Sequence, residues 1–331
     1  MSRSRLKVAF DTAGGQRAGV GHLLRSIALA GQLRSLKAEV TMLSKEKALP
    51  PLVLFAMRAA RLDAASHDAS SPQVVVIDRP DTTLARLRRL HRRWPAAMLV
   101  ALDYYGPSAE GLALVINLNE ARERLRVGGA RVDFRGLRFA ILRASFRRLR
   151  QEQRRVPTRI RQILVGFGGT DPKGWSQQAI QALTRCVPRD VSIHLLSGGS
   201  RPGEDQEACF FEGSVTQHIA VADPAPLLRA SDLAVIGGGT MLIEAACLGV
   251  PAVVVPRTPE ERLFARQFAR AGAVRLVQAE KGFPAKAIQR HVTGLFDDAD
   301  MRRKMQQAGR QLVDGRGANR VAKLIVQVAA K

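Results

Sequence analysis

The stretch from Leu233 to Val255 reads LAVIGGGTMLIEAACLGVPAVVV, and it decides the fold class. A short apolar strand (233–236) leads into three consecutive glycines. An apolar helical stretch (240–248) and a second strand rich in valine (252–255) follow them. A strand, a glycine loop, a helix and a strand in this order are typical of parallel α/β sheets.

The three glycines, Gly237, Gly238 and Gly239, open a helix directly after a strand. The unpaired N–H groups and the positive end of the helix dipole make such a loop suited to a diphosphate. We expect Thr240 to cap the helix or to hydrogen-bond the phosphate. Glu244 lies one turn later on the same face and is suited to accept hydrogen bonds from both hydroxyls of a ribose. A glutamate that is favoured only by the helix dipole is the alternative.

Strands and helices alternate along the whole chain, as in doubly wound folds. We expect strands at 6–10, 74–77, 98–102, 114–118, 163–167, 192–196, 233–236 and 252–255, and helices at 22–36, 173–186, 240–248, 260–271, 284–296, 299–312 and 316–329. Residues 147–161 are polar, basic and broken by Pro157, so they are predicted to connect two domains, residues 1–150 and 151–331. The predicted fold class is α/β, with two Rossmann-like domains whose parallel sheets face a central cleft.

A second glycine motif, GVGHLLR, spans residues 19–25 at a junction of strand, loop and helix. Gly19 and Gly21 allow the backbone to approach a ligand closely. His22 stands in the first helical turn and is suited to proton transfer near neutral pH, and Arg25 lies one turn further on a similar face. We predict that His22 is catalytic and that the two glycines and Arg25 bind substrate. A histidine that only caps a tight turn is the alternative.

A third glycine motif, VGFGGTDP, spans residues 165–172. Gly168, Gly169 and Thr170 are candidates to contact a phosphate or a sugar, whereas Asp171 is expected to cap the following helix. The strands at 74–77 and 98–102 end at Asp78 and Asp103. Strand ends of this kind carry ligand groups in open α/β sheets, and Asp103 is therefore a further candidate for substrate binding.

The composition limits the function classes. The chain has 331 residues and a net charge of +23, and residues 1–160 hold 30 basic and 13 acidic side chains. Such a field attracts phosphorylated substrates or anionic lipid, although an arginine-rich composition without a binding role explains it as well. We expect no specific nucleic-acid binding, because no RNA- or DNA-binding motif is present. The arginines at 86, 88, 89, 92 and 93 and those in 143–155 are the candidates for peripheral contact with an anionic membrane.

No apolar run reaches the roughly 20 residues of a membrane-spanning helix, and the first residues lack a signal-peptide core. The three cysteines are scattered and show no metal-ligand spacing. We therefore expect a cytoplasmic protein, with contact at the inner face of the membrane left open, that needs neither a metal nor a cofactor.

The three glycine motifs in this order resemble those of the GT-B enzymes. Within these enzymes the chain looks most like the family of UDP-2,4-diacetamido-2,4,6-trideoxy-β-L-altropyranose hydrolases of pseudaminic acid synthesis, which also covers spore-coat polysaccharide proteins. The resemblance spans nearly the whole chain and rests on GVGHLLRSIALA (19–30), VINLN (115–119), FAILR (139–143), FGGTDP (167–172), residues 237–244 and VDGRGANRVA (313–322).

The resemblance implies that the second domain binds UDP, with Glu244 on the ribose and the loop Gly237–Thr240 at the diphosphate. It also implies that His22 positions or activates the water that attacks the anomeric carbon, so that UDP leaves with inversion at that carbon. The substrate is then a UDP-sugar.

Two segments depart from the family pattern. Phe10-Asp11-Thr12-Ala13 stands where the family has F-R-x-D, and Asp78-Arg79-Pro80-Asp81 stands where it has Asp-His-Tyr-Gly. In the family these residues line the sugar side of the cleft, which leaves the sugar and the acceptor open. The alternatives are an inverting glycosyltransferase of the same fold that acts on a surface-polysaccharide or lipid-linked acceptor, a UDP-sugar epimerase, and a non-catalytic polyanion-binding protein.

Overall fold

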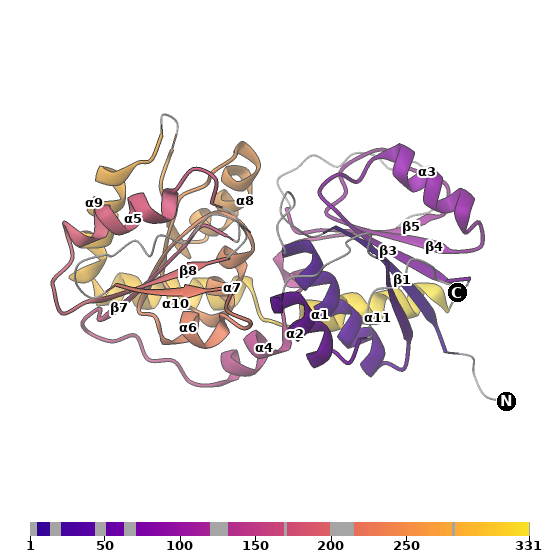
Figure 1. Cartoon of the computed structure of the whole chain (residues 1–331), viewed down its shortest axis with the longest axis horizontal. Helices are drawn as coiled ribbons and strands as arrows, with labels where there is room; N and C mark the ends of the chain where they lie inside the picture. Colours follow the sequence, from indigo (N-terminus) through magenta and orange to yellow (C-terminus); the bar gives the residue numbers. More distant parts are fainter. Residues whose placement is uncertain are drawn as a thin grey trace. The chain divides into compact units, whose positions relative to one another are not determined.

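The computed structural model describes residues 5–13, 21–43, 51–62, 71–119, 132–168, 171–198, 215–279 and 282–330. The chain forms two compact units (Figure 1). Unit 1 consists of Met1–Ala144 with Gly315–Lys331, and unit 2 consists of Ser145–Asp314. The described residues of each unit form a six-stranded parallel sheet with helices on both faces.

Unit 1 is built around one sheet. Its strands are β1 (Lys7–Thr12), β2 (Glu39–Leu43), β3 (Val74–Asp78), β4 (Met98–Leu102), β5 (Leu112–Asn117) and β6 (Val132–Arg135). Its helices are α1 (Gly21–Ser35), α2 (Pro51–Ala59), α3 (Leu84–Arg93), the short 3₁₀ helix η1 (Leu137–Phe139) and α11 (Gly317–Ala329). The strand order is β2-β1-β3-β4-β5-β6. The strand that follows β1 in sequence lies on one side of it and the later strands lie on the other, so the strand order reverses between β1 and β3. Such a position is a topological switch point. Ligands of open α/β sheets bind there, outside the carboxyl ends of the strands.

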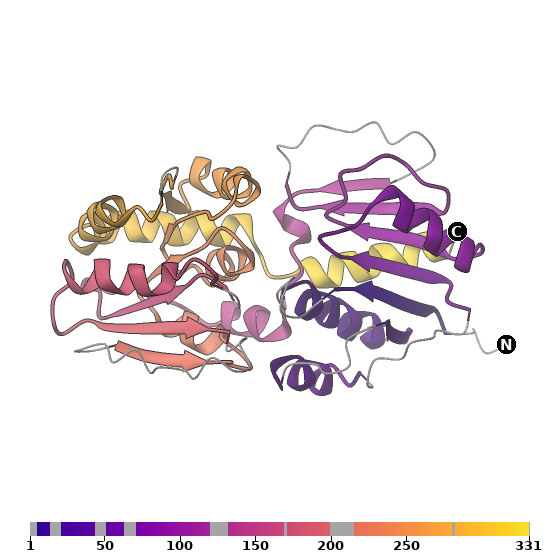
Figure 2. The same cartoon turned by 45° about the horizontal axis from the view of Figure 1, so that its top comes forward.

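Helices cover both faces of this sheet, and the strands are accordingly apolar along their length. All five residues of β3 are buried. Helix α3 packs on one face through Leu87 and Leu90. Helix α1 lies on the opposite face beside α11 and buries Leu23, Ile27 and Leu33 (Figure 2). This packing fixes the first turn of α1 next to the carboxyl ends of β1 and β3.

Unit 2 repeats the architecture. Its strands are β7 (Gln162–Gly166), β8 (Ser192–Ser197), β9 (Val215–Ile219), β10 (Leu233–Ile236), β11 (Ala252–Val254) and β12 (Val274–Leu276). Its helices are α4 (Ala144–Gln151), α5 (Trp175–Thr184), α6 (Ala225–Ala230), α7 (Thr240–Leu248), α8 (Pro259–Arg270), α9 (Ala285–Phe296) and α10 (Ala299–Leu312). The strand order is β12-β11-β10-β7-β8-β9, which places the switch point of unit 2 between β7 and β10.

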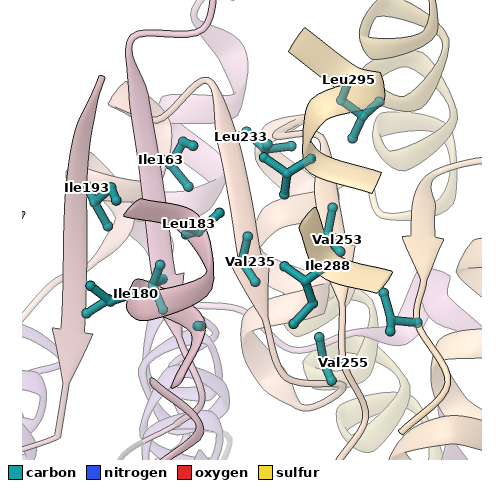
Figure 3. Packing of buried hydrophobic residues seen from close by; sticks show 14 of the residues in the cluster. Ile163, Ile180, Leu183, Ile193, Leu233, Val235, Val253, Val255, Ile288 and Leu295 are labelled. Carbon is teal, nitrogen blue, oxygen red and sulfur yellow. The ribbon is translucent and has the colours of Figure 1, made fainter. Parts of the chain in front are cut away.

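The core of unit 2 lies between its sheet and two helices. Ile180 and Leu183 of α5 and Ile288 of α9 point onto the sheet, where they meet side chains such as Ile163 and Val235 (Figure 3). All five side chains are fully buried. The apolar runs of the sequence therefore form the core, and their glycine-rich continuations form loops at the carboxyl edge of the sheet.

The predicted α/β fold class with two Rossmann-like domains is confirmed, and so are the predicted strands and helices, with ends that agree within two residues. The cleft between the two domains stays a prediction. The division between the units differs from the expected boundary after residue 150 in two places. The chain passes into unit 2 after Ala144, and the last helix returns to unit 1. Gly317 explains the return, because a Cβ at this position would lie 2.1 Å from the carbonyl oxygen of Ala140, so α11 packs against unit 1 at backbone distance.

The predicted connection at 147–161 is also more structured than expected. Its first residues belong to helix α4, and two of its arginines bind main-chain oxygens of unit 2. Arg150 donates to the carbonyl of Cys247 at 2.7 Å, and Arg154 donates to the carbonyls of Arg229 and Ser231. The guanidinium groups of these two arginines thus bind main-chain carbonyls within unit 2. They were expected to be candidates for membrane contact, but these hydrogen bonds engage them inside the protein.

Candidate functional site

The candidate residues of unit 1 gather at its switch point. Asp78 ends β3 and has a fully buried side chain. The Nδ1 atom of His22, in the first turn of α1, lies 2.7 Å from the Oδ1 atom of Asp78. Because a carboxylate only accepts hydrogen bonds, we assign the proton to Nδ1, and a neutral His22 then keeps a lone pair on Nε2. The side chain of His22 is 27% exposed, so the ring is open to solvent on one side.

Arg25 joins Asp78 to the neighbouring strand end. Its guanidinium donates to both carboxylate oxygens of Asp78, and its Nη1 donates to the Oδ2 atom of Asp103 at 2.5 Å. Ser26 adds a hydrogen bond from its hydroxyl to Asp78 at 3.0 Å. Burial would raise the pKa of Asp78, but Arg25 and the hydrogen bond from His22 outweigh burial and lower the pKa to about 2. Asp78 is therefore a charged, fully hydrogen-bonded carboxylate at neutral pH.

Asp103 follows β4 in a left-handed backbone conformation with a φ of 52°, which is uncommon for a residue other than glycine. Its amide donates to the carbonyl of Ile116 at 2.8 Å, and its Oδ1 atom accepts from the amide of Leu118 at 3.0 Å. These bonds turn the Oδ2 atom toward Arg25. A shallow depression lies beside this ion pair, and its apolar wall consists of Leu102, Ile116, Leu118, Phe139 and Ile141.

The segments that depart from the family pattern form ion pairs of their own at the same sheet edge. Asp11 accepts two hydrogen bonds of 2.6 Å from the guanidinium of Arg86. Arg79 donates to the carbonyl of Thr12 at 3.0 Å and pairs with Asp81. Arg86 was expected to belong to the basic membrane-facing stretch. That expectation is wrong for this residue, because the guanidinium of Arg86 is paired with the carboxylate of Asp11.

In unit 2 the glycine loop after β10 lies at the switch point. The amide of Gly237 continues the sheet by donating to the carbonyl of Gly166 at 3.1 Å. Gly239 is the N-cap of α7, and no side chain among the described residues caps this helix end. Thr240 is exposed and is the first helical residue, so the predicted capping by its hydroxyl is not observed. The first turn of α7 thus has the uncapped helix start that the predicted anion site requires.

Glu244 lies on α7 one turn after Thr240 and is 8% exposed. The structure thus places Glu244 close behind the glycine loop but largely buried. Asp171 accepts from the amides of Trp175 and Ser176 at 3.1 and 2.6 Å, which confirms its capping role, although α5 begins later than predicted. Gly168 follows β7 with a φ of 94°.

Gly21 is the first residue of α1. Three other predicted site residues, Gly19, Gly169 and Thr170, lie outside the described residues.

From the sequence, Arg257 and Glu261 could border the pocket of the glycine loop, but a solvated helix start is the favoured interpretation. The structure contradicts that favoured interpretation, because the two side chains are only 25% and 15% exposed. Glu261 accepts from the amide of Gly238 at 3.3 Å and from the amide and the guanidinium of Arg257 at 2.8 and 2.7 Å. The sequence signal that could have found them is their position directly after a strand that neighbours the glycine loop.

Asp78 was also missed as a site residue, although its position at a strand end was noted. Among the described residues, no cluster of three or more histidine, cysteine, aspartate or glutamate side chains has the arrangement of a metal site. None of the described helices combines the length and the apolar character that a membrane span requires.

Comparison with known proteins agrees with this architecture. No protein-family model matches the chain. The chain is 26% identical over 245 residues to the spore coat polysaccharide biosynthesis protein SpsG of Bacillus subtilis, and the match covers 72% of each protein. It is 24% identical over 278 residues to an uncharacterized protein of Methanocaldococcus jannaschii, which covers 78% of this chain and 57% of that relative. The chain thus spans little more than half the length of the second relative.

Solved structures resemble the chain over almost its full length. They include S. aureus MnaA with UDP (12% identity, TM-score 0.66, 98% of each chain) and the spinosyn forosaminyltransferase SpnP (14%, 0.64, 99% of this chain and 100% of that chain). HepE of Anabaena in complex with UDP-glucose is similar as well (15%, 0.60, 97% and 98%). Together with the two parallel sheets, these structures show that the chain has the two-domain α/β GT-B fold.

Proposed function

We propose that this protein is a sugar-nucleotide enzyme of surface-polysaccharide biosynthesis that cleaves the anomeric C–O bond of a UDP-sugar. The observation that carries the proposal is the contact of His22 with the buried carboxylate of Asp78 at the switch point of unit 1. The biosynthetic role is supported by the name of the B. subtilis relative, and the nucleotide by the UDP and UDP-glucose in similar structures.

The arrangement of His22 suits it to act as a general base. The Nε2 lone pair takes a proton from water as the water oxygen bonds to the anomeric carbon, while the C–O bond to UDP breaks on the opposite side. The imidazolium that forms lies 2.7 Å from the carboxylate of Asp78, which stabilises it. The products are the free sugar, with inverted configuration, and UDP, and the proton returns from His22 to solvent.

In this proposal unit 2 holds the nucleotide. The uncapped first turn of α7 receives the diphosphate, with Gly237, Gly238, Gly239 and Thr240 along the loop. Glu244 accepts hydrogen bonds from the ribose hydroxyls. Because Glu244 is only 8% exposed, little of its side chain is accessible to the ribose in the ligand-free protein.

In unit 1, Asp103 binds the sugar beside the shallow apolar depression. The guanidinium of Arg25 is already engaged by Asp78 and Asp103, so Arg25 acts mainly by holding Asp103 in place. The hydrolase of the pseudaminic acid pathway is the specific activity that this proposal favours.

A glycosyltransferase is the second candidate, because the same base serves an acceptor hydroxyl as well as water. The observation that favours it is the exposed basic surface of α3, formed by four residues that we call the α3 arginines: Arg88, Arg89, Arg92 and Arg93. Such a surface suits peripheral contact with an anionic membrane, where lipid-linked acceptors reside.

Mass spectrometry of the products distinguishes these activities. The protein is incubated with a panel of UDP-sugars, with and without polysaccharide and lipid-linked acceptors. Free sugar in the absence of acceptor supports the hydrolase, transferred sugar supports the glycosyltransferase, and an isomeric UDP-sugar supports an epimerase. No turnover with any donor would refute the proposal and leave a non-catalytic polyanion-binding protein.

A further inference from the structure

The guanidinium of Arg257 lies at the switch point of unit 2, against two glycine loops. Arg257 belongs to the loop between β11 and α8. A Cβ built on Gly168, after β7, would lie 3.6 Å from Nη1 of Arg257, and a Cβ built on Gly237, after β10, would lie 3.5 Å from its Nε. The carboxyl ends of β7 and β10 flank the switch point, so this partly buried cation stands at the place where ligands of open α/β sheets bind.

Helix α8 packs directly on the second of these loops. A Cβ on Gly238 would lie 2.9 Å from the Cβ of Glu261 and 3.0 Å from its carbonyl oxygen. A side chain at position 238 would therefore push α8 away from the loop. The close approach brings the carboxylate of Glu261 to the amide of Gly238, in front of the first turn of α7.

The carboxylate of Glu261 accepts hydrogen bonds from donors of the kind that bind a phosphate. Its carboxylate accepts from two backbone amides, those of Gly238 at 3.3 Å and Arg257 at 2.8 Å. It also accepts from the guanidinium of Arg257 at 2.7 Å. Amides of a glycine loop combined with an arginine fork are a common arrangement for binding phosphate oxygens. In the ligand-free protein an internal carboxylate occupies these donors.

We infer that Arg257 binds the diphosphate of the nucleotide. In the absence of nucleotide, the carboxylate of Glu261 occupies the position of the diphosphate beside Arg257. This inference rests on the proposed function, since it concerns the same nucleotide site. The diphosphate carries more negative charge than one carboxylate and offers several oxygens, so it displaces Glu261 from the guanidinium. Glu261 thus competes with the ligand, and Arg257 distinguishes nucleoside diphosphates from ligands without a phosphate.

Calorimetric titration of the full chain with UDP, uridine and pyrophosphate tests the inference. In Arg257→Ala the affinity for UDP and pyrophosphate should fall by about 10–100-fold, the loss expected for charge-assisted hydrogen bonds, while the affinity for uridine stays unchanged. Arg257→Lys should recover part of the UDP affinity, because it restores a positive charge without the fork. Arg266→Ala is the matched control, since Arg266 is an exposed arginine of helix α8, which follows the loop that holds Arg257.

Glu261→Gln separates a competitor from a structural partner. If Glu261 competes with the diphosphate, the neutral glutamine should raise UDP affinity several-fold. If the pair only fastens α8, the substitution should lower UDP affinity and the thermal midpoint together, and this result would overturn the competitor role. UDP and pyrophosphate binding of Arg257→Ala equal to that of the wild type would overturn the role of Arg257. Failure of the wild-type protein to bind UDP while it binds pyrophosphate through Arg257 would contradict the proposed function alone.

Discussion

Replacing Asp78 by asparagine keeps the shape of the side chain but removes its charge. The asparagine amide can donate to Nδ1 of His22, which would shift the ring proton to Nε2 and remove the base. It also leaves the buried guanidinium of Arg25 with one carboxylate partner, Asp103. We expect kcat to fall by about 10²–10⁴-fold, the range of general-base catalysis, while the affinity for UDP stays unchanged.

The structure also sets the expected loss of stability. The folded-state pKa of Asp78 is about 2 against a usual value of 3.8, and each pKa unit corresponds to about 1.4 kcal/mol. Asp78→Asn should therefore lose about 2–3 kcal/mol of unfolding free energy at neutral pH, in line with breaking one side of a buried ion pair. Urea unfolding measures this loss, and the rate of UDP release per folded molecule measures kcat.

Asp11→Asn is the comparison variant. It removes a buried carboxylate from the same sheet edge, where Asp11 pairs with Arg86 and not with His22. Both variants remove one partner of an ion pair and should lose stability, but Asp11→Asn should lose much less kcat. If Asp78→Asn kept kcat within a few-fold of the wild type, or if both variants lost kcat equally, Asp78 would not act through His22.

Three further predictions follow from the structure. Because the pKa of Asp78 is lowered, its contribution to stability is fully present above the unfolded-state pKa near 4 and is lost as the pH falls through about 2. The difference in unfolding free energy between the wild type and Asp78→Asn should therefore shrink between these two pH values in urea titrations. A difference that does not depend on pH would argue against the ion pair. Glu244→Gln should weaken UDP binding at least about tenfold by calorimetry with little change in thermal midpoint, and unchanged affinity would remove Glu244 from the nucleotide site. Replacing the α3 arginines by glutamine should abolish sedimentation with phosphatidylserine vesicles at low salt, whereas absence of wild-type binding under the same conditions would leave the basic surface without a membrane role.

The fold was predictable because the apolar runs are local signals. The continuous VVVI of β3 and the strand–glycine–helix pattern around Gly237 each identify a parallel strand without knowledge of the partners. Helix α3 was missed since its core residues, Leu87 and Leu90, stand among arginines in LARLRRLHRR. The return of α11 to unit 1 was missed for a different reason. The contact of Gly317 with Ala140 joins positions far apart in sequence.

The site was predictable only in part for the same reason. His22 and Gly237 can be identified from the sequence because each stands beside glycines at the start of a helix. Asp78 differs from any other strand-end aspartate only through His22 and Arg25, which lie 56 and 53 residues away. Glu261 likewise has the sequence context of an ordinary first helical turn, and only the packing of α8 on Gly238 brings its carboxylate to the loop.

The most direct test of the central claim is kcat of His22→Asn, measured together with its thermal midpoint and its UDP affinity on the UDP-sugar that the donor panel identifies. If His22 is the base, kcat should fall by about 10²–10⁴-fold, while the midpoint and the UDP affinity stay close to those of the wild type. If His22 only supports the turn before α1, the variant would be destabilised and each folded molecule would remain as active as the wild type. That result would contradict the account.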